Sequence, residues 1–209
     1  TRSGTGVYRV TFDGMSGDLG LGHIQVSAYG STVANCQVSA WGGTSLGVTV
    51  RCFDPAGDPV DTQYTVLVTW PSDTDANGVA FAWANQSDVD SYEPSSSYSY
   101  NPAERPITAS RSGVGAYAMS FANFGDDGGS AGGNVQVSAY GSTAATCKVS
   151  GWSAGSGPFA ANVRCTDPAG QPVDTRYTIL ATWPTRVPVA NEDGQLAGTT
   201  RLESYPNPS

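Results

Sequence analysis

The sequence predicts an all-β protein built from two homologous antiparallel domains, each sandwich- or barrel-like and each closed by one disulfide. The first observation is a repeat: DPAGDPVDT at 54–62 returns as DPAGQPVDT at 167–175, and SAYGST at 27–32 returns at 138–143. The second is composition, because 26 Gly, 13 Pro and 10 Tyr accompany short Val/Thr-rich segments bounded by turn residues, which is typical of strands. The third is the presence of 4 Cys, two in each copy.

The repeat also predicts the domain organisation. The offset between matching segments grows along the chain from 109 to 111 to 113 residues, through insertions near 124–134 and 153–159 in the second copy. Insertions confined to Gly/Ser-rich stretches are what surface loops tolerate. A unit of about a hundred residues is an ordinary single domain. We therefore expect one domain over residues 1–95 and a second over residues 96–209.

The strands of the first copy follow from alternating Val, Tyr and Thr between turn signals. The predicted strands are 6–12, 23–29, 35–41, 47–53, 63–70 and 79–85. The first five have clear partners in the second copy. The sixth has none, because the sequence after Trp183 is a poor strand, and the linker 91–106 contains YSYN, a possible strand of the second domain.

The cysteines fix a strand register. Antiparallel pairing of Cys36 with Cys52, and of Cys147 with Cys165, puts every small or apolar residue of each hairpin on one face. The resulting opposed pairs are Val38–Val50, Ala40–Val48, Val149–Val163 and Gly151–Ala161. We therefore predict the disulfides Cys36–Cys52 and Cys147–Cys165, with free buried thiols as the alternative. Disulfides persist in oxidising compartments, so the protein is expected to be secreted and extracellular.

The repeated DPAG stretch is a turn, because Pro presets φ and Gly tolerates positive φ. Asp54 and Asp167 are expected to accept backbone N–H groups within it, and Asp61 and Asp174 to do the same where the next strand begins. A catalytic role for these aspartates is the alternative.

The succession GxYxVxF, VQVSAYG, CxVSxW, VxVRCFDPAGxPxDxxYTVL and AFAWA resembles tandem repeats of uncharacterised secreted bacterial proteins. The resemblance covers nearly the whole chain. It implies export and an all-β unit, and it implies no activity and no catalytic residue.

Several classes of function are disfavoured. The net charge is −8 without a basic cluster, so a nucleic-acid partner is not expected, and no apolar run reaches membrane-spanning length. The chain begins at Thr1 without Met, which is compatible with removal of a leader. The only histidine, His23, is replaced by Asn134 in the second copy and is expected to face solvent from a strand. The remaining catalytic hypothesis is a pair of carboxylates, as in glycosidases. The chain has 18 acidic residues, so the sequence does not indicate which two would form the pair.

One acidic segment, DTDANG at 73–78, resembles the first half of a calcium-binding loop. Its predicted ligands are Asp73, Asp75 and Asn77, with Asp88, Asp90 or Glu93 as the source of a further carboxylate. The pattern departs from the full motif at Ala84, where Glu is required, so an ordinary solvated hairpin loop is the alternative. Calcium is the only cofactor considered.

A polar and aromatic face recurs in both copies. If the cysteine-bearing face points inward, alternation turns the other side chains outward, and aromatics beside amide, hydroxyl and guanidinium groups suit a sugar. The predicted ligand-binding residues are Tyr29, Gln37, Trp41, Arg51, Tyr140, Trp152 and Arg164. The alternative is cross-strand pairing or contact between the domains. Trp70 and Trp183 are predicted to lie in the cores.

The sequence therefore favours a secreted, monomeric, non-catalytic module that binds glycan or cell-wall polysaccharide. The alternative from another class is a carboxylate-dependent polysaccharide hydrolase with its site between the two domains. A structural surface repeat or an inhibitor is the third hypothesis.

Overall fold

The computed structural model describes residues 1–16, 22–70, 78–125, 133–153 and 157–183. The protein is all-β, as predicted, and the short 3₁₀ turn η2 (Ser96–Tyr98) lies between strands. The strands before residue 70 are β1 (Arg2–Gly4), β2 (Val7–Ser16), β3 (His23–Tyr29), β4 (Asn35–Gly42), β5 (Ser45–Phe53) and β6 (Gln63–Thr69). The later strands are β7 (Val79–Ala84), β8 (Ser91–Tyr92), β9 (Ile107–Gly113), β10 (Ala116–Phe121), β11 (Asn134–Tyr140), β12 (Thr146–Ser153), β13 (Phe159–Thr166) and β14 (Arg176–Thr182).

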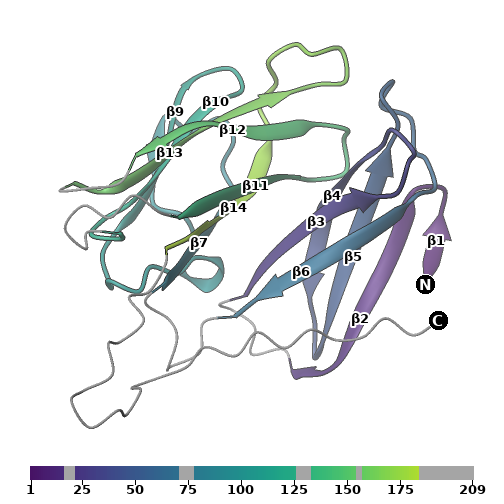
Figure 1. Ribbon diagram of the computed structural model, residues 1–209, viewed down its shortest axis with the longest axis horizontal. Coiled ribbons are helices and arrows are strands. Elements are labelled where there is room, and N and C mark those ends of the chain that lie inside the picture. The colour runs from purple at the N-terminus through teal and green to yellow at the C-terminus, as the bar shows by residue number, and fades with distance from the viewer. Residues whose placement is uncertain (17–21, 71–77, 126–132, 154–156, 184–209) are drawn as a thin grey trace, which may run out of the picture.

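The strands form two layered units side by side, which we call the first half (residues 1–70) and the second half (residues 107–183) (Figure 1). In the first half the strand order β4-β5-β2-β1 lies opposite the pair β3-β6. In the second half β12-β13-β10-β9-β8 lies opposite β11-β14-β7. The same order therefore recurs in both halves, and each half is a small sandwich rather than a barrel. A single parallel bridge, Tyr140 to Val38, joins the sheets of the two halves.

Both predicted disulfides are confirmed: Cys36–Cys52 lies in the first half and Cys147–Cys165 in the second. The predicted register is correct for Val38–Val50 and Val149–Val163 and wrong beyond them. A β-bulge follows Val38 and another follows Val149. Each bulge adds one residue to its strand, which reverses the alternation of all later side chains. The pairs that replace the predicted ones are Ala40–Thr49, Trp41–Val48, Gly151–Asn162 and Trp152–Ala161.

Strand β7 connects the halves. It lies before the predicted boundary at residue 95, yet it pairs along its whole length with β14 of the second half. Its alanines enter the core of the second half, while Phe81 and Trp83 face aromatic rings of the other half and of η2. The boundary itself stays a prediction.

The two cores differ in size. The core of the first half contains Ile24, Val26, Cys36, Val38, Leu46, Val48, Val50 and Cys52. The core of the second half is larger because β7 and the segment around Phe124 add to it, and it holds Tyr117, Met119, Phe121, Phe159, Tyr177, Ile179 and Trp183.

The DPAG turns are held as predicted. The Asp54 Oδ1 accepts the backbone N–H groups of Ala56 and Asp58 at 2.9 and 3.0 Å, and Asp167 Oδ1 accepts that of Gln171 at 2.8 Å. These bonds replace the water that would otherwise satisfy the turn's backbone donors. Both turns are therefore rigid projections at equivalent places in the two halves.

The second pair of aspartates binds backbone N–H groups far along the chain rather than in the turn. In the second half Asp174 accepts from Gly115 N at 2.9 Å, from Tyr117 Oη at 2.9 Å and from both nitrogens of the Arg111 fork. Asp61 has the same partners at equivalent positions, Gly6, Tyr8 and Arg2. Gly115 has φ +63°, and a Cβ there would collide with the carbonyl oxygen of Cys165. The positive φ and the close approach both require glycine.

Candidate binding cleft between the two halves

The site begins with a loop of the second half, residues 141–146, that docks on strand β4. The Gln37 side chain reaches across and donates to the carbonyl oxygens of Gly141 and Thr143 at 2.8 and 2.9 Å. Its Oε1 accepts the Ala145 N–H at 3.3 Å, and Asn35 Nδ2 donates to the Ala145 carbonyl at 2.9 Å. These bonds satisfy backbone groups at Gly141 and Ala145, which are buried where the halves meet, and they join the loop to β4.

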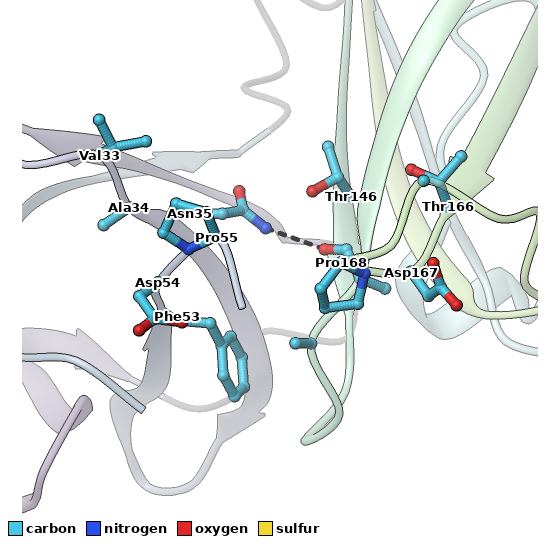
Figure 2. Close-up of a pocket in the computed structure, with 13 residues that line it drawn as sticks. Val33, Ala34, Asn35, Phe53, Asp54, Pro55, Thr146, Thr166, Asp167 and Pro168 are labelled. Atoms are coloured by element: carbon cyan, nitrogen blue, oxygen red, sulfur yellow. Dashed lines mark hydrogen bonds between the residues drawn. The ribbon is translucent and has the colours of Figure 1, made fainter. Parts of the chain in front are cut away.

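Beside this loop lies a cleft of about 370 Å³ between the two DPAG turns. Figure 2 shows Asp54 and Pro55 on one side of it and Asp167 and Pro168 on the other. The first half adds Val33, Ala34, Asn35 and Phe53, and the second half adds Ala144, Ala145, Thr146, Thr166 and Gly170.

The two walls of the cleft are built from equivalent positions. Residues 33–35 match residues 144–146 at the offset of 111, and residues 53–55 match residues 166–168 at the offset of 113. The turns also approach closely, since a Cβ on Gly57 would lie 2.7 Å from Pro168 Cγ. The same surface of each half therefore faces the other, with a carboxylate on each side.

The chemistry of the cleft is mixed. One oxygen of each carboxylate holds its own turn, which leaves the other oxygen of Asp54 and of Asp167 available as an acceptor. Thr146 and Thr166 add hydroxyl groups, while Pro55, Pro168 and the exposed Val33 add apolar surface. A ligand that carries hydroxyl groups on an otherwise C–H surface matches this set.

The predicted polar face is wrong for Gln37 and Trp41. Gln37 is completely buried by the loop described above. Trp41 lies beyond the β-bulge, on the same face as the disulfide, and its ring meets those of Trp83 and Tyr140 edge to face at 5.6 and 5.3 Å. Tyr98 contacts both tryptophans as well, so these four half-buried rings form an aromatic cluster between the halves. Arg176 lies 5.0 Å from the centre of the Tyr140 ring, within cation–π range.

The remaining predicted ligand-binding residues do not gather at one place. Tyr29, Trp152 and Arg164 are exposed, and Arg51 is half-buried beside Gln37. Trp152 stacks on Phe159 at 5.7 Å and keeps 42% of its surface exposed, so it presents an aromatic ring to solvent. In the described part of the chain, no contact between aromatic rings joins Trp152 or Tyr29 to the cluster around Trp41.

Two further expectations are corrected. His23 is buried, not solvent-facing, because β3 packs its outer face on β14 and β7, and the His23 ring lies 5.6 Å from that of Phe81 in β7. Trp70 is exposed, not core, whereas Trp183 is buried as predicted. Trp183 is covered by the backbone near Gly125 and Gly133, and these glycines flank the second-copy insertion.

The predicted calcium ligands Asp73, Asp75 and Asn77 lie outside the described residues. Within the residues that the structure describes, no group of three or more His, Cys, Asp or Glu side chains converges as a metal site would require. Calcium therefore stays a prediction.

The cleft residues were not singled out from the sequence, with the exception of Asp54 and Asp167, which were considered for catalysis and interpreted as turn residues. The one feature of the sequence that could have pointed to the cleft is the repeated turn. If two identical turns meet across an interface, they present the same chemical groups to each other. The sequence carries no sign that these two turns would face each other.

No protein-family model, curated protein sequence or solved structure matches this chain. The fold and the site define the class: a double β-sandwich with one disulfide in each half and a cleft of mixed polarity between two equivalent turns. The two disulfides are consistent with an oxidising, extracellular environment. No helix among the described residues has the length and apolar character needed to span a bilayer.

Proposed function

We propose that this protein is a secreted, monomeric, non-catalytic module that binds polysaccharide in the cleft between its DPAG turns. The observation that carries the proposal is that equivalent positions of the two halves line the cleft, with one carboxylate from each half, Asp54 and Asp167. A polysaccharide also repeats its hydroxyl groups along one direction, so a repeated lining suits it.

The polar groups of the cleft are held in place before any ligand arrives. Asp54 and Asp167 are fixed by hydrogen bonds to their own turns, and Asn35 is fixed by its bond to Ala145. Preorganised acceptors lose little conformational entropy on binding. Pro55 and Pro168 add rigid C–H surface beside the carboxylates, which suits the alternating C–H and O–H character of a sugar.

The test is retention of the full chain on immobilised polysaccharides, with variants of the cleft. The double variant Asp54→Asn, Asp167→Asn keeps an oxygen that holds each turn and removes both carboxylate charges. We expect it to weaken binding by about tenfold or more, since hydrogen bonds to charged groups contribute about 1.5–3 kcal/mol each. Asp58→Asn is the matched control, because Asp58 lies in the same turn without lining the cleft.

The exposed Trp152 ring is the rival binding surface. Trp152→Ala should leave retention unchanged if the cleft is the site. Loss of retention in Trp152→Ala, together with full retention in the double aspartate variant, would contradict the proposal and favour the exposed face of the second half.

The hydrolase hypothesis keeps one specific support, the two carboxylates on opposite sides of a single cleft. It predicts release of reducing ends from a polysaccharide, and loss of that release in both Asp54→Asn and Asp167→Asn. A binding module releases none. Measuring reducing ends on the same panel of polysaccharides therefore separates the two functions.

A further inference from the structure

Strands β6 and β14 share a sequence pattern, QYTVLVT against RYTILAT, and occupy equivalent places in their halves. Their neighbours differ. Strand β14 is paired on both edges, with β11 and with β7. Strand β6 pairs with β3 alone among the strands that the structure describes. The second edge of β6 is thus a place where the described part of the first half lacks a strand that the second half has.

The difference changes the burial of equivalent side chains. On the inner face Tyr177, Ile179 and Ala181 of β14 are fully buried, whereas the matching residues Tyr64, Val66 and Val68 of β6 are only half-buried. On the outer face Leu180 is 4% exposed and its equivalent Leu67 is 48% exposed. An open strand edge beside exposed apolar side chains is a template for pairing with another strand.

The second half shows what fills this place. Strand β7 adds to β14 in antiparallel register, with Ala84 opposite Tyr177, Ala82 opposite Ile179 and Ala80 opposite Ala181. Alanines of β7 therefore lie opposite Tyr177, Ile179 and Ala181. The matching residues of β6 are Tyr64, Val66 and Val68. The strand is supplied by sequence that precedes the second half, because β7 comes before β9 in the chain.

The outer face of β14 is also covered by a strand that precedes the second half in the sequence. Strand β3 of the first half packs on it, where Thr178 Oγ1 donates to the Ile24 carbonyl at 3.2 Å. One preceding unit thus covers both the edge and the outer face of β14. The free edge of β6 and the exposed Leu67 are the two surfaces that an equivalent preceding unit would cover.

We propose that the free edge of β6 is an acceptor for a β7-type strand donated by another repeat of the same kind. The donor is an extended segment with alanine at alternate positions facing the core of the first half. It adds by backbone hydrogen bonds, as in other cases of strand addition. Repeats of this kind would then join head to tail, each completing the sandwich of the next. This inference does not depend on the proposed polysaccharide binding.

The chain supplies its own probe. Residues 78–109 carry β7 and β8 and end directly before Ser110, which is the equivalent of Thr1. Placing a second copy of residues 78–109 ahead of Thr1 gives the first half what the second half already has. We expect the amide protons on the free edge of β6 to exchange at least about tenfold more slowly. The melting temperature should rise by about 5 °C or more.

The control is the same extension with its three alanines, the copies of Ala80, Ala82 and Ala84, replaced by Asp. Charged side chains cannot enter the core, so this extension should leave β6 exchange and melting as in the parent chain. Equal protection by both extensions, or by neither, would overturn the proposal. Deleting residues 184–209 from the parent chain is the second arm: if the deletion speeds exchange in β6, the chain's own C-terminal segment already occupies the edge, and the proposal is wrong.

Discussion

Two tyrosines in the same position of the repeat have different surroundings. Tyr64 and Tyr177 each contact the tyrosine of the neighbouring sheet, Tyr8 at 4.9 Å and Tyr117 at 5.3 Å. Tyr177 is nevertheless buried and Tyr64 half-exposed, because β7 covers β14 and no described strand covers β6. Burial raises the pKa of both hydroxyl groups, and it does so far more at Tyr177. A tyrosine at the same position of the repeat therefore lies in the core of the second half and at the edge of the core in the first half.

The tryptophans that follow these strands differ in the same way. Trp70 is 40% exposed and Trp183 is 8% exposed, although both end the motif Tyr-Thr-x-x-x-Thr-Trp. Trp183 is covered by the backbone at Gly125 and Gly133, and its backbone N–H donates to the Gly78 carbonyl at 2.7 Å. The comparison teaches that the burial of a repeated residue depends on which other segments of the same chain pack against it.

The largest expected effect is at the two tyrosines. Tyr177→Ala should lower the free energy of unfolding by about 3–5 kcal/mol, since it removes a large, fully buried side chain. Tyr64→Ala should lower it by about 1–2 kcal/mol, because Tyr64 is already half-exposed. Urea unfolding of both variants measures the difference. Tyr177→Phe is the control and should be nearly neutral, since the buried Tyr177 hydroxyl has no hydrogen-bond partner among the residues that the structure describes. Equal losses in the two Ala variants would contradict the comparison.

The disulfides should show no such asymmetry. They close loops of similar length, with sequence separations of 16 and 18 residues. Replacing either pair by Ala should therefore lower stability by about 3 kcal/mol. Thermal melting of the two double variants tests this. A much larger loss for Cys147/Cys165 than for Cys36/Cys52 would mean that the halves depend on their crosslinks unequally.

The third effect is a pH dependence confined to the first half. Burial lowers the pKa of His23 to about 3, whereas an unfolded histidine has a pKa of about 6.5. Between these values the unfolded chain binds a proton that the folded chain does not, so stability falls as the pH falls from about 6.5 towards 3. At pH 4.5 the loss should be about 2–3 kcal/mol relative to pH 7.

His23→Asn introduces the residue that the second half carries as Asn134. The variant should lose this part of the acid dependence. Urea midpoints measured from pH 7 to pH 4 provide the comparison. An unchanged slope in the variant would show that His23 is protonated in the folded protein.

The smallest effect concerns the repeated ion pairs. The Arg111 side chain donates to Asp174 and lowers the pKa of that carboxyl to about 2, and Asp61 is shifted in the same direction by Arg2. Each pair therefore stabilises the fold above about pH 4, and this stability is lost as the pH falls towards the folded-state pKa. Asp174→Asn should destabilise the fold at pH 7 by about 1–2 kcal/mol.

Asp61→Asn should have a smaller effect, because water screens the more exposed pair. The side chains of Arg2 and Asp61 are 53% and 45% exposed, against 20% and 27% for Arg111 and Asp174. Parallel urea titrations at pH 7 rank the two. A larger loss at Asp61 would reverse the ranking of burial between the halves.

The sequence by itself determined the all-β class, both disulfides and the turns held by Asp54 and Asp167. These features depend on short-range patterns: alternation along a strand, cysteines opposite each other in one hairpin, and the preference of Asp-Pro-x-Gly for a turn. The five strands shared by both copies were predicted within a few residues for the same reason. Such patterns act within one hairpin and need no knowledge of the rest of the chain.

Only the tertiary structure decided where the predicted side chains point and what they meet. One extra residue in a bulge turned Trp41 to the disulfide side, and no composition signal marks that bulge. The predictions for Gln37, His23 and β7 used only the local sequence around each of them. Their contacts are with residues more than fifty positions away along the chain. The burial of a strand's face depends on which strand adds to its edge, and that is a property of the assembled sheets rather than of the strand's own sequence.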